Sequence, residues 1–113
     1  KTLKDLLADE LGVETFERET PGTAGVASAL LMRSNPNRIA FVYMNLSTGD
    51  THRIRPNAPA STTAGLIVGA SEWRSFLYRE DFVLPAREWH VISSVAGSAF
   101  YLLELLLLGG EEK

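Results

Sequence analysis

One segment of the sequence reads Ile39-Ala40-Phe41-Val42-Tyr43-Met44-Asn45-Leu46, and both of its alternating sets of side chains are largely apolar. A second segment, Phe100-Tyr101-Leu102-Leu103-Glu104-Leu105-Leu106-Leu107-Leu108, has the same property. Successive side chains of a β-strand point to opposite faces of a sheet, so a strand that is apolar on both faces is covered on both faces. The two segments therefore predict strands with more apolar surface than the core of one small sandwich can take up.

The sequence around these segments, from Val26 onward, consists of short apolar runs interrupted by turn residues. The clearest turns are Ser34-Asn35-Pro36-Asn37 and Ser47-Thr48-Gly49-Asp50, whose residue types supply the backbone geometries that turns need. This pattern is typical of an antiparallel sandwich or barrel. We predict a mainly β fold, an antiparallel, jelly-roll-like β-sandwich over residues 23–113. Its expected strands are 26–32, 39–46, 52–55, 64–69, 75–79, 88–94 and 99–108.

Residues 98–108 are open to a second interpretation, because leucine favours helices and the run ends at Gly109-Gly110. The preceding turn at Gly97-Ser98 and the aromatic pair Phe100-Tyr101 favour a strand. We expect the strand, with a second helix as the alternative.

Residues 1–22 follow a different pattern. Leucines recur at helical spacing between Thr2, a suitable N-cap, and Gly12, a suitable stop. They predict a short amphipathic helix over residues 3–11, followed by a linker that contains Pro21 and Gly22. Because so short a helix is marginal alone in water, its apolar face would dock on its own domain or on a neighbouring subunit. The apolar positions of this arm are Leu3, Leu6, Leu7 and Leu11.

Length and composition set further limits. A chain of 113 residues fits one domain, and the absence of cysteine excludes a disulfide framework or a thiolate zinc site. A net charge of −3 and a sequence pI near 5.3 argue against nucleic-acid binding. No apolar run approaches the roughly 20 residues of a membrane-spanning helix. The sequence starts at Lys1 rather than Met, which is compatible with a processed or trimmed product whose targeting signal has been removed.

Residues that could carry catalysis are few. His52 and His90 are the only histidines, no nucleophile elbow is present, and no metal-ligand spacing occurs. We expect both histidines at the surface or rim, and we expect neither enzymatic activity nor a cofactor or metal. A carbohydrate- or ligand-binding module is the alternative function, with Trp73, Phe76 and Tyr78 as a stacking platform. Trp89, beside Val91 and Ile92, is expected in the core.

The stretch from Arg33 to Glu104 resembles a small β-sandwich found among virion structural proteins of tailed bacteriophages. Such proteins carry an Asn-x-x-Arg turn before an apolar strand that ends in Asn, then a glycine-led strand, an acidic edge and a closing hairpin near a glutamate. The matching elements here are Asn35-Pro36-Asn37-Arg38, Ile39 to Asn45, Gly65-Leu66-Ile67-Val68, Glu80-Asp81, Trp89-His90-Val91-Ile92-Ser93-Ser94 and Leu102-Leu103-Glu104.

This resemblance implies a capsid decoration or head-associated protein, located in virions that assemble in the host cytoplasm. It also implies a symmetric homo-oligomer, with a trimer as one candidate symmetry, that binds other virion or capsid proteins but neither nucleic acid nor membrane. The apolar strands independently predict subunit contacts. The expected contact residues are the arm leucines Leu3, Leu6, Leu7 and Leu11, together with Tyr43, Tyr101, Leu103 and Leu105.

Overall fold

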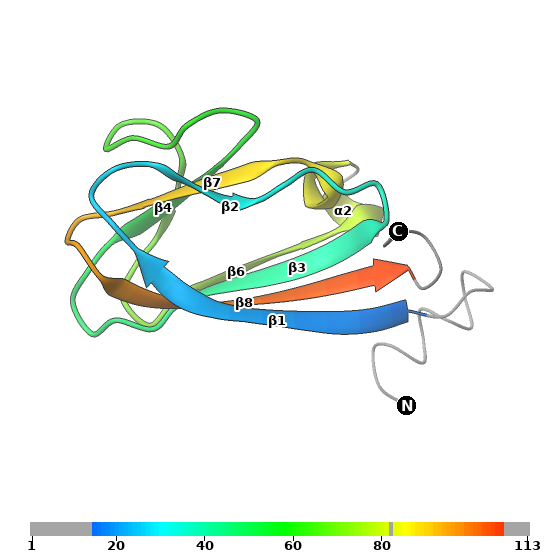
Figure 1. The fold of residues 1–113 in the computed structure, drawn as a ribbon, viewed down its shortest axis with the longest axis horizontal. Coiled ribbons are helices and arrows are strands. Elements are labelled where there is room, and N and C mark those ends of the chain that lie inside the picture. The colour runs from blue at the N-terminus through cyan, green and yellow to red at the C-terminus, as the bar shows by residue number, and fades with distance from the viewer. Residues whose placement is uncertain (1–14, 82, 108–113) are drawn as a thin grey trace.

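The computed structural model describes residues 15–81 and 83–107, which form two stacked β-sheets (Figure 1). The predicted helix over residues 3–11 and its four leucines lie outside the described residues. The strands are β1 (Thr15–Ala24), β2 (Ala29–Met32), β3 (Arg38–Asn45), β4 (His52–Pro56), β5 (Leu66–Val68), β6 (Trp73–Leu77), β7 (Trp89–Ser93) and β8 (Ser98–Leu107). Two short helical segments, α2 (Tyr78–Asp81) and the 3-10 turn η1 (Leu84–Ala86), join β6 to β7.

The two sheets have the strand order of a jelly roll. Sheet A is ordered β1-β8-β3-β6 and sheet B is ordered β2-β7-β4-β5. All the pairings are antiparallel, and they are nested: β4 pairs with β5, β3 with β6, β2 with β7 and β1 with β8. Nested pairs of this kind arise when one long hairpin rolls up into two four-stranded sheets. The prediction of a mainly β, antiparallel sandwich is confirmed.

Residues 98–108 were the ambiguous segment, and the described part of it is a strand. β8 is paired on both sides, with β1 and with β3, along most of its length. Its inward residues include Phe100 and Leu102, which are buried in the main core. A helix could not supply both ladders, so the helical alternative is excluded for Ser98–Leu107.

The prediction of a linker over residues 12–22 is wrong for residues 15–22, because these belong to β1. This strand pairs with β8 in continuous register and forms an edge of sheet A. An edge strand tolerates Pro21, whose missing N–H need not pair. Gly22 is also required there, since a Cβ atom at this position would lie 2.9 Å from the Cζ atom of Phe100.

The main core lies between the sheets and is largely aromatic. The Phe41 ring centroid is 5.1 Å from those of both Phe76 and Trp89, and Tyr43 stacks on Phe100 at 5.3 Å. Trp89 is fully buried, as the sequence predicts, and its indole Nε1 donates a hydrogen bond to the Leu84 carbonyl at 2.9 Å. The aromatic rings therefore link β3, β6, β7 and β8 across the sandwich.

A buried ion pair joins the two central strands of sheet A at the end nearest η1. Arg38 on β3 donates from Nε to the Glu104 carboxylate on β8 at 2.7 Å. Its remaining donors bind the carbonyls of Pro85, Arg87 and Arg33 at 3.1, 3.1 and 2.6 Å. Burial alone would raise the pKa of Glu104, but hydrogen bonds and charge from Arg18 and Arg38 hold that pKa below its ordinary value. The carboxylate thus stays charged, and its contribution to stability is lost only as the pH falls below about 4, through the lowered pKa.

We expect Arg38→Met to lower the free energy of unfolding by about 3–5 kcal/mol, because it leaves three carbonyls without their donor and the buried Glu104 carboxylate with Arg18 as its remaining cation. Arg38→Met combined with Glu104→Leu should recover part of the loss. Arg74→Met is the matched control, since its partner Glu72 is exposed and such pairs contribute less than about 1 kcal/mol. Urea denaturation measures all three, and equal losses for Arg38→Met and Arg74→Met would contradict the structural role of the pair.

Candidate functional site

The structure corrects the predicted positions of His52 and Tyr43, both of which are fully buried. The Tyr43 hydroxyl lies 2.7 Å from Nδ1 of His52, and Nε2 of His52 lies 2.7 Å from Oγ of Ser98. Ser98 in turn donates to the Asp50 carboxylate at 2.8 Å. His52 alternates with Ile54 on the inward face of β4, and this alternation is the signal that the sequence offered. Tyr43 is therefore a core residue and cannot be a subunit contact.

The hydrogen bonds that link Tyr43 to Asp50 all have their donors on the Tyr43 side. Because Ser98 gives its proton to Asp50, it accepts one from Nε2 of His52, and Nδ1 of His52 accepts the Tyr43 proton. His52 is then neutral, in agreement with the lowering of its pKa by burial, which the charge of Asp50 only partly opposes. Burial also raises the pKa of Tyr43, so its hydroxyl keeps its proton.

Ser98, His52 and Asp50 do not have the arrangement of a catalytic triad. In a triad the carboxylate orients the histidine, which takes the proton of the serine. Here the Asp50 carboxylate accepts a hydrogen bond from Ser98 directly, and Nδ1 of His52 is bound by the Tyr43 hydroxyl. Ser98 is only 4% exposed, so a substrate carbonyl cannot reach it. The contacts satisfy the buried polar groups of Tyr43, His52 and Ser98, so they stabilise the fold.

His90, the second histidine, lies on the outer face of sheet B. It is half-buried, and its Nε2 atom lies 2.8 Å from the Glu88 carboxylate. This position agrees with the expected rim location.

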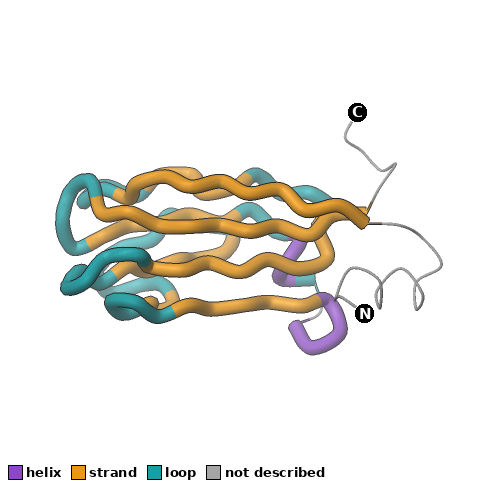
Figure 2. The backbone as a smooth tube through the Cα atoms, turned by 90° about the horizontal axis from the view of Figure 1, so that it is seen from below, coloured by secondary structure: helices purple, strands orange, loops and turns teal. Residues whose placement is uncertain are grey.

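The outer face of sheet A has apolar side chains at its centre. Cross-strand register places Leu103 between Glu19 of β1 and Val42 of β3, and Tyr101 between Pro21 and Met44. Figure 2, which views the molecule from below, shows the four strands of sheet A side by side with no described element crossing them. Tyr101 and Leu103 are half-buried on this face.

Leu105 points to the same face but contributes little surface to it. It is 6% exposed because it packs with Ile39, Ala40, Tyr78 and Leu107 near the start of α2. Leu105 is therefore mainly a packing residue of the chain itself, which differs from its expected place in an interface.

Acidic side chains border the face along β1. Glu17 and Glu19 are exposed and stand opposite Leu105 and Leu103 in the ladder. A side-chain hydrogen bond to Glu19 raises the pKa of Tyr101. The face therefore combines an apolar centre with a negatively charged rim.

The proposed aromatic platform is not formed. Trp73 is 56% exposed on the outer face of sheet A, whereas Phe76 points inward and stacks on Phe41. Tyr78 packs against Ile39 and Leu105. The three aromatic rings thus lie in different places and do not form one surface.

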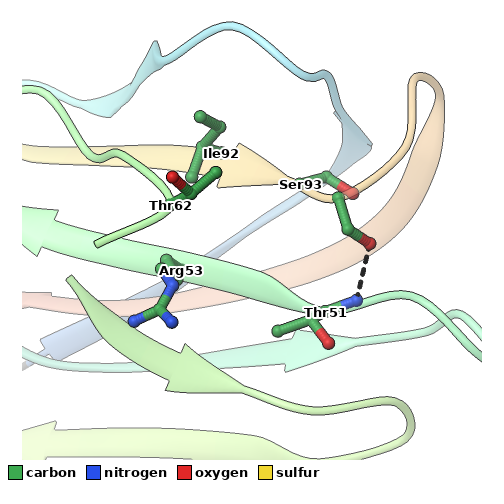
Figure 3. Close-up of a pocket in the computed structure, with 6 residues that line it drawn as sticks. Thr51, Arg53, Thr62, Ile92 and Ser93 are labelled. Atoms are coloured by element: carbon green, nitrogen blue, oxygen red, sulfur yellow. Dashed lines mark hydrogen bonds between the residues drawn. The ribbon is translucent and has the colours of Figure 1, made fainter. Parts of the chain in front are cut away.

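Two of the hollows in the described surface lie near these faces. A shallow one of about 210 Å³ lies on the outer face of sheet B, among Arg53 of β4, Ile92 of β7 and Thr62 (Figure 3). It is smaller than the roughly 300–1,000 Å³ of sites for drug-sized ligands. The second, of about 400 Å³, opens between β1 and β2 and contains Arg18, Arg33 and the Arg38–Glu104 pair.

Within residues 15–81 and 83–107, no group of three or more histidine or acidic side chains is arranged to hold a metal ion. No helix in the described part of the chain is long and apolar enough to cross a membrane.

We expect stability to depend on pH through His52. An unfolded histidine gains a proton near pH 6.5, whereas the lowered pKa keeps folded His52 neutral to a lower pH. Stability should therefore be full above pH 7 and fall by up to about 1 kcal/mol as the pH drops to 5.5. Urea midpoints across this range measure the slope, which should be smaller in His52→Gln. An unchanged slope in His52→Gln would rule out this assignment.

No family model matches the sequence, and no curated protein matches it. Among solved structures, a protein of the disulfide-linked pili that form Bacillus endospore appendages is similar with a TM-score of 0.53. The two are 16% identical, and the alignment covers 86% of this chain and 89% of that one. A cupin protein from Bacteroides fragilis aligns with a TM-score of 0.42, 17% identity, and 95% and 78% coverage of this and that chain. For Tobacco streak virus coat protein the values are 0.39, 9%, 88% and 90%. The pilus likeness supports the fold alone, and the other two are too distant to support a conclusion.

Proposed function

We propose that this protein is a structural subunit that acts by non-covalent assembly and has no catalytic role. The observation that carries the proposal is the outer face of sheet A, an apolar surface with an acidic rim that no described element covers. Soluble sheets normally place polar side chains on a face turned to water. A face built from Leu103, Val42, Met44 and Tyr101 is instead suited to burial against another copy of the chain.

The geometry of this face favours a flat, symmetric contact. The strands present their side chains in even rows, and the described turns lie at the ends of the sandwich rather than over the face. The same face of two copies meets about a two-fold axis, whereas a trimer, which is also to be tested, would pair this face with a different patch of the next copy. Glu17 and Glu19 at the rim would stay in contact with water.

The finer proposal is a virion structural protein of a tailed bacteriophage, of the capsid decoration or head-associated class. Its support is the pattern of Asn35, Arg38, Asn45 and Glu104 that this chain shares with such proteins. A protein of similar fold forms the pili of Bacillus endospore appendages. That pilus is described as disulfide-linked, whereas this chain has no cysteine, so its subunit contacts would be non-covalent.

We expect Leu103→Lys to dissociate the oligomer without unfolding the chain. The new ammonium group would stand opposite Glu19 in the β1–β8 ladder, which keeps the monomer stable, yet it places charge in the centre of the apolar contact. Size-exclusion chromatography with light scattering should show an oligomer for the wild type and a monomer for the variant.

Val95→Lys is the matched control, because Val95 is an exposed apolar residue in the turn between β7 and β8, away from the face. It should leave the oligomer intact. A monomeric wild type at high concentration, or an oligomer that Leu103→Lys does not affect, would refute assembly through sheet A.

The virion assignment has a separate test. Mass spectrometry of purified particles should find this chain among the structural proteins, and particles made without it should lose their contents at a lower temperature. Its absence from the particles would overturn the virion assignment while leaving the assembly proposal to its own measurement.

A further inference from the structure

The outer face of sheet A carries acidic groups along one edge only. Glu17 and Glu19 project from β1 at this edge, and both are exposed. At the opposite edge, β6 presents Trp73, Ser75 and Leu77, which are uncharged. The face therefore has an acidic side and a neutral side, separated by the apolar side chains of β8 and β3.

The neutral side has groups suited to a contact. Trp73 is 56% exposed, and its indole Nε1 has no hydrogen-bond partner among the residues that the structure describes. The same holds for the hydroxyl of Ser75 within this part of the chain. Cross-strand register places Trp73 in one row with Met44, Tyr101 and Pro21. Because tryptophan and tyrosine are enriched among residues that carry the binding energy of protein interfaces, this row can form the centre of a contact.

The face is large enough for a dimer. At about 3.3 Å per residue and about 4.8 Å between strands, the four strands of sheet A cover about 500 Å². Two such faces would together bury about 1,000 Å², which is the lower limit for a specific protein interface. The apolar centre, with Leu103 and Val42, belongs to β8 and β3, so it is buried most completely when the axis between the copies passes over these two strands.

Two alignments of the copies keep their strands nearly parallel, as in the aligned packing of sheets. If the two-fold axis runs across the strands, β1 lies over β1 of the other copy, and the carboxylates of Glu17 and Glu19 approach their equivalents. If the axis runs along the strands, β1 lies over β6 of the other copy, whose outward side chains are uncharged. Like charges across an interface disfavour the first alignment.

A two-fold dimer also needs no second flat face, whereas a ring does. The outer face of sheet B is not equally open, because Thr62 in the connection from β4 to β5 borders Ile92 of β7. Ala60 of the same connection donates its backbone N–H to Oγ of Ser28, which precedes the edge strand β2. This connection therefore occupies space that a flat partner would need.

We propose that two copies of the chain form a dimer about a two-fold axis that runs along the strands between β8 and β3, with Trp73 of each copy against β1 of the other. Trp73 then lies over Pro21 of the other copy. Ser75 lies over Glu19 of the other copy, whose carboxylate binds Tyr101 and can accept a further hydrogen bond from the serine hydroxyl. This dimer presupposes the assembly through sheet A proposed above, and it specifies which strands of the two copies meet.

The absence of cysteine from the chain allows a direct test of the alignment. Glu19→Cys and Ser75→Cys are prepared separately and treated with a short bismaleimide, each alone and as an equal mixture. The mixture should give a covalent dimer and neither variant alone should, because each thiol lies over the other position. Ile67→Cys, an exposed position on β5 of sheet B, is the matched control and should give no covalent dimer.

Sedimentation equilibrium supplies a second measurement. Ser75→Lys should tighten the dimer about fivefold at low salt, since two exposed ion pairs with Glu19 form per dimer, and Glu19→Gln should abolish this gain. Trp73→Ala should raise the dissociation constant at least about tenfold. Ile67→Ala should leave it unchanged, because Ile67 lies on the other sheet.

Four results would overturn this alignment: a covalent dimer from either cysteine variant alone, no covalent dimer in the mixture, a weaker dimer for Ser75→Lys, or a trimer in sedimentation. None of them would touch assembly through sheet A, which Leu103→Lys tests separately. A monomeric wild type would remove both proposals together.

Discussion

The buried pair of Arg38 and Glu104 is the interaction on which this small sandwich depends most. It joins β3 to β8 in the centre of sheet A, and the same guanidinium binds carbonyls of the segment before β7 and of the turn after β2. Removing two charges from water costs several kcal/mol each, and only excellent geometry offsets this. Here Nε, Nη1 and Nη2 of Arg38 all have acceptors, so the pair fixes one end of the fold in a single arrangement.

A second polar cluster fixes the opposite end. The Nδ2 group of Asn45 donates to the carbonyls of Asp50 and Val68, and its Oδ1 accepts from Ser47. Beside it, the chain from Tyr43 through His52 and Ser98 ends on Asp50. Polar clusters at both ends and aromatic rings between them thus hold the two sheets together.

The parts of the structure that the sequence predicts are those where side-chain pattern and burial agree. β3 and β8 are apolar on both faces, and Trp89 lies in an apolar run, so their positions follow from the hydrophobic effect. β1 has no such pattern, because it is an edge strand whose outward residues are charged and which contains Pro21 and Gly22. Its pairing with β8 depends on residues far away in the sequence, and local propensity cannot show it.

The sequence also could not show which of the alternating side chains of a strand face the core. Alternation could not decide whether Tyr43 or its neighbours point to the core, and a buried histidine resembles an exposed one in sequence until its partners Tyr43 and Ser98 are known. The residues from which the virion assignment was predicted include Arg38, Asn45 and Glu104, all buried and hydrogen-bonded within the chain. They specify how the sandwich closes. A pattern of this kind therefore predicts a fold well and a binding partner poorly.

The two faces of β1 separate opposite charges at one edge. Glu17 and Glu19 point outward beside the apolar face of sheet A, whereas Arg18 points inward to the hollow between β1 and β2. If two copies paired edge to edge through β1, these glutamates would approach each other, which disfavours that contact. The alternation of charge along β1 thus makes the outer face of sheet A a better place than this edge for a contact between copies of the chain.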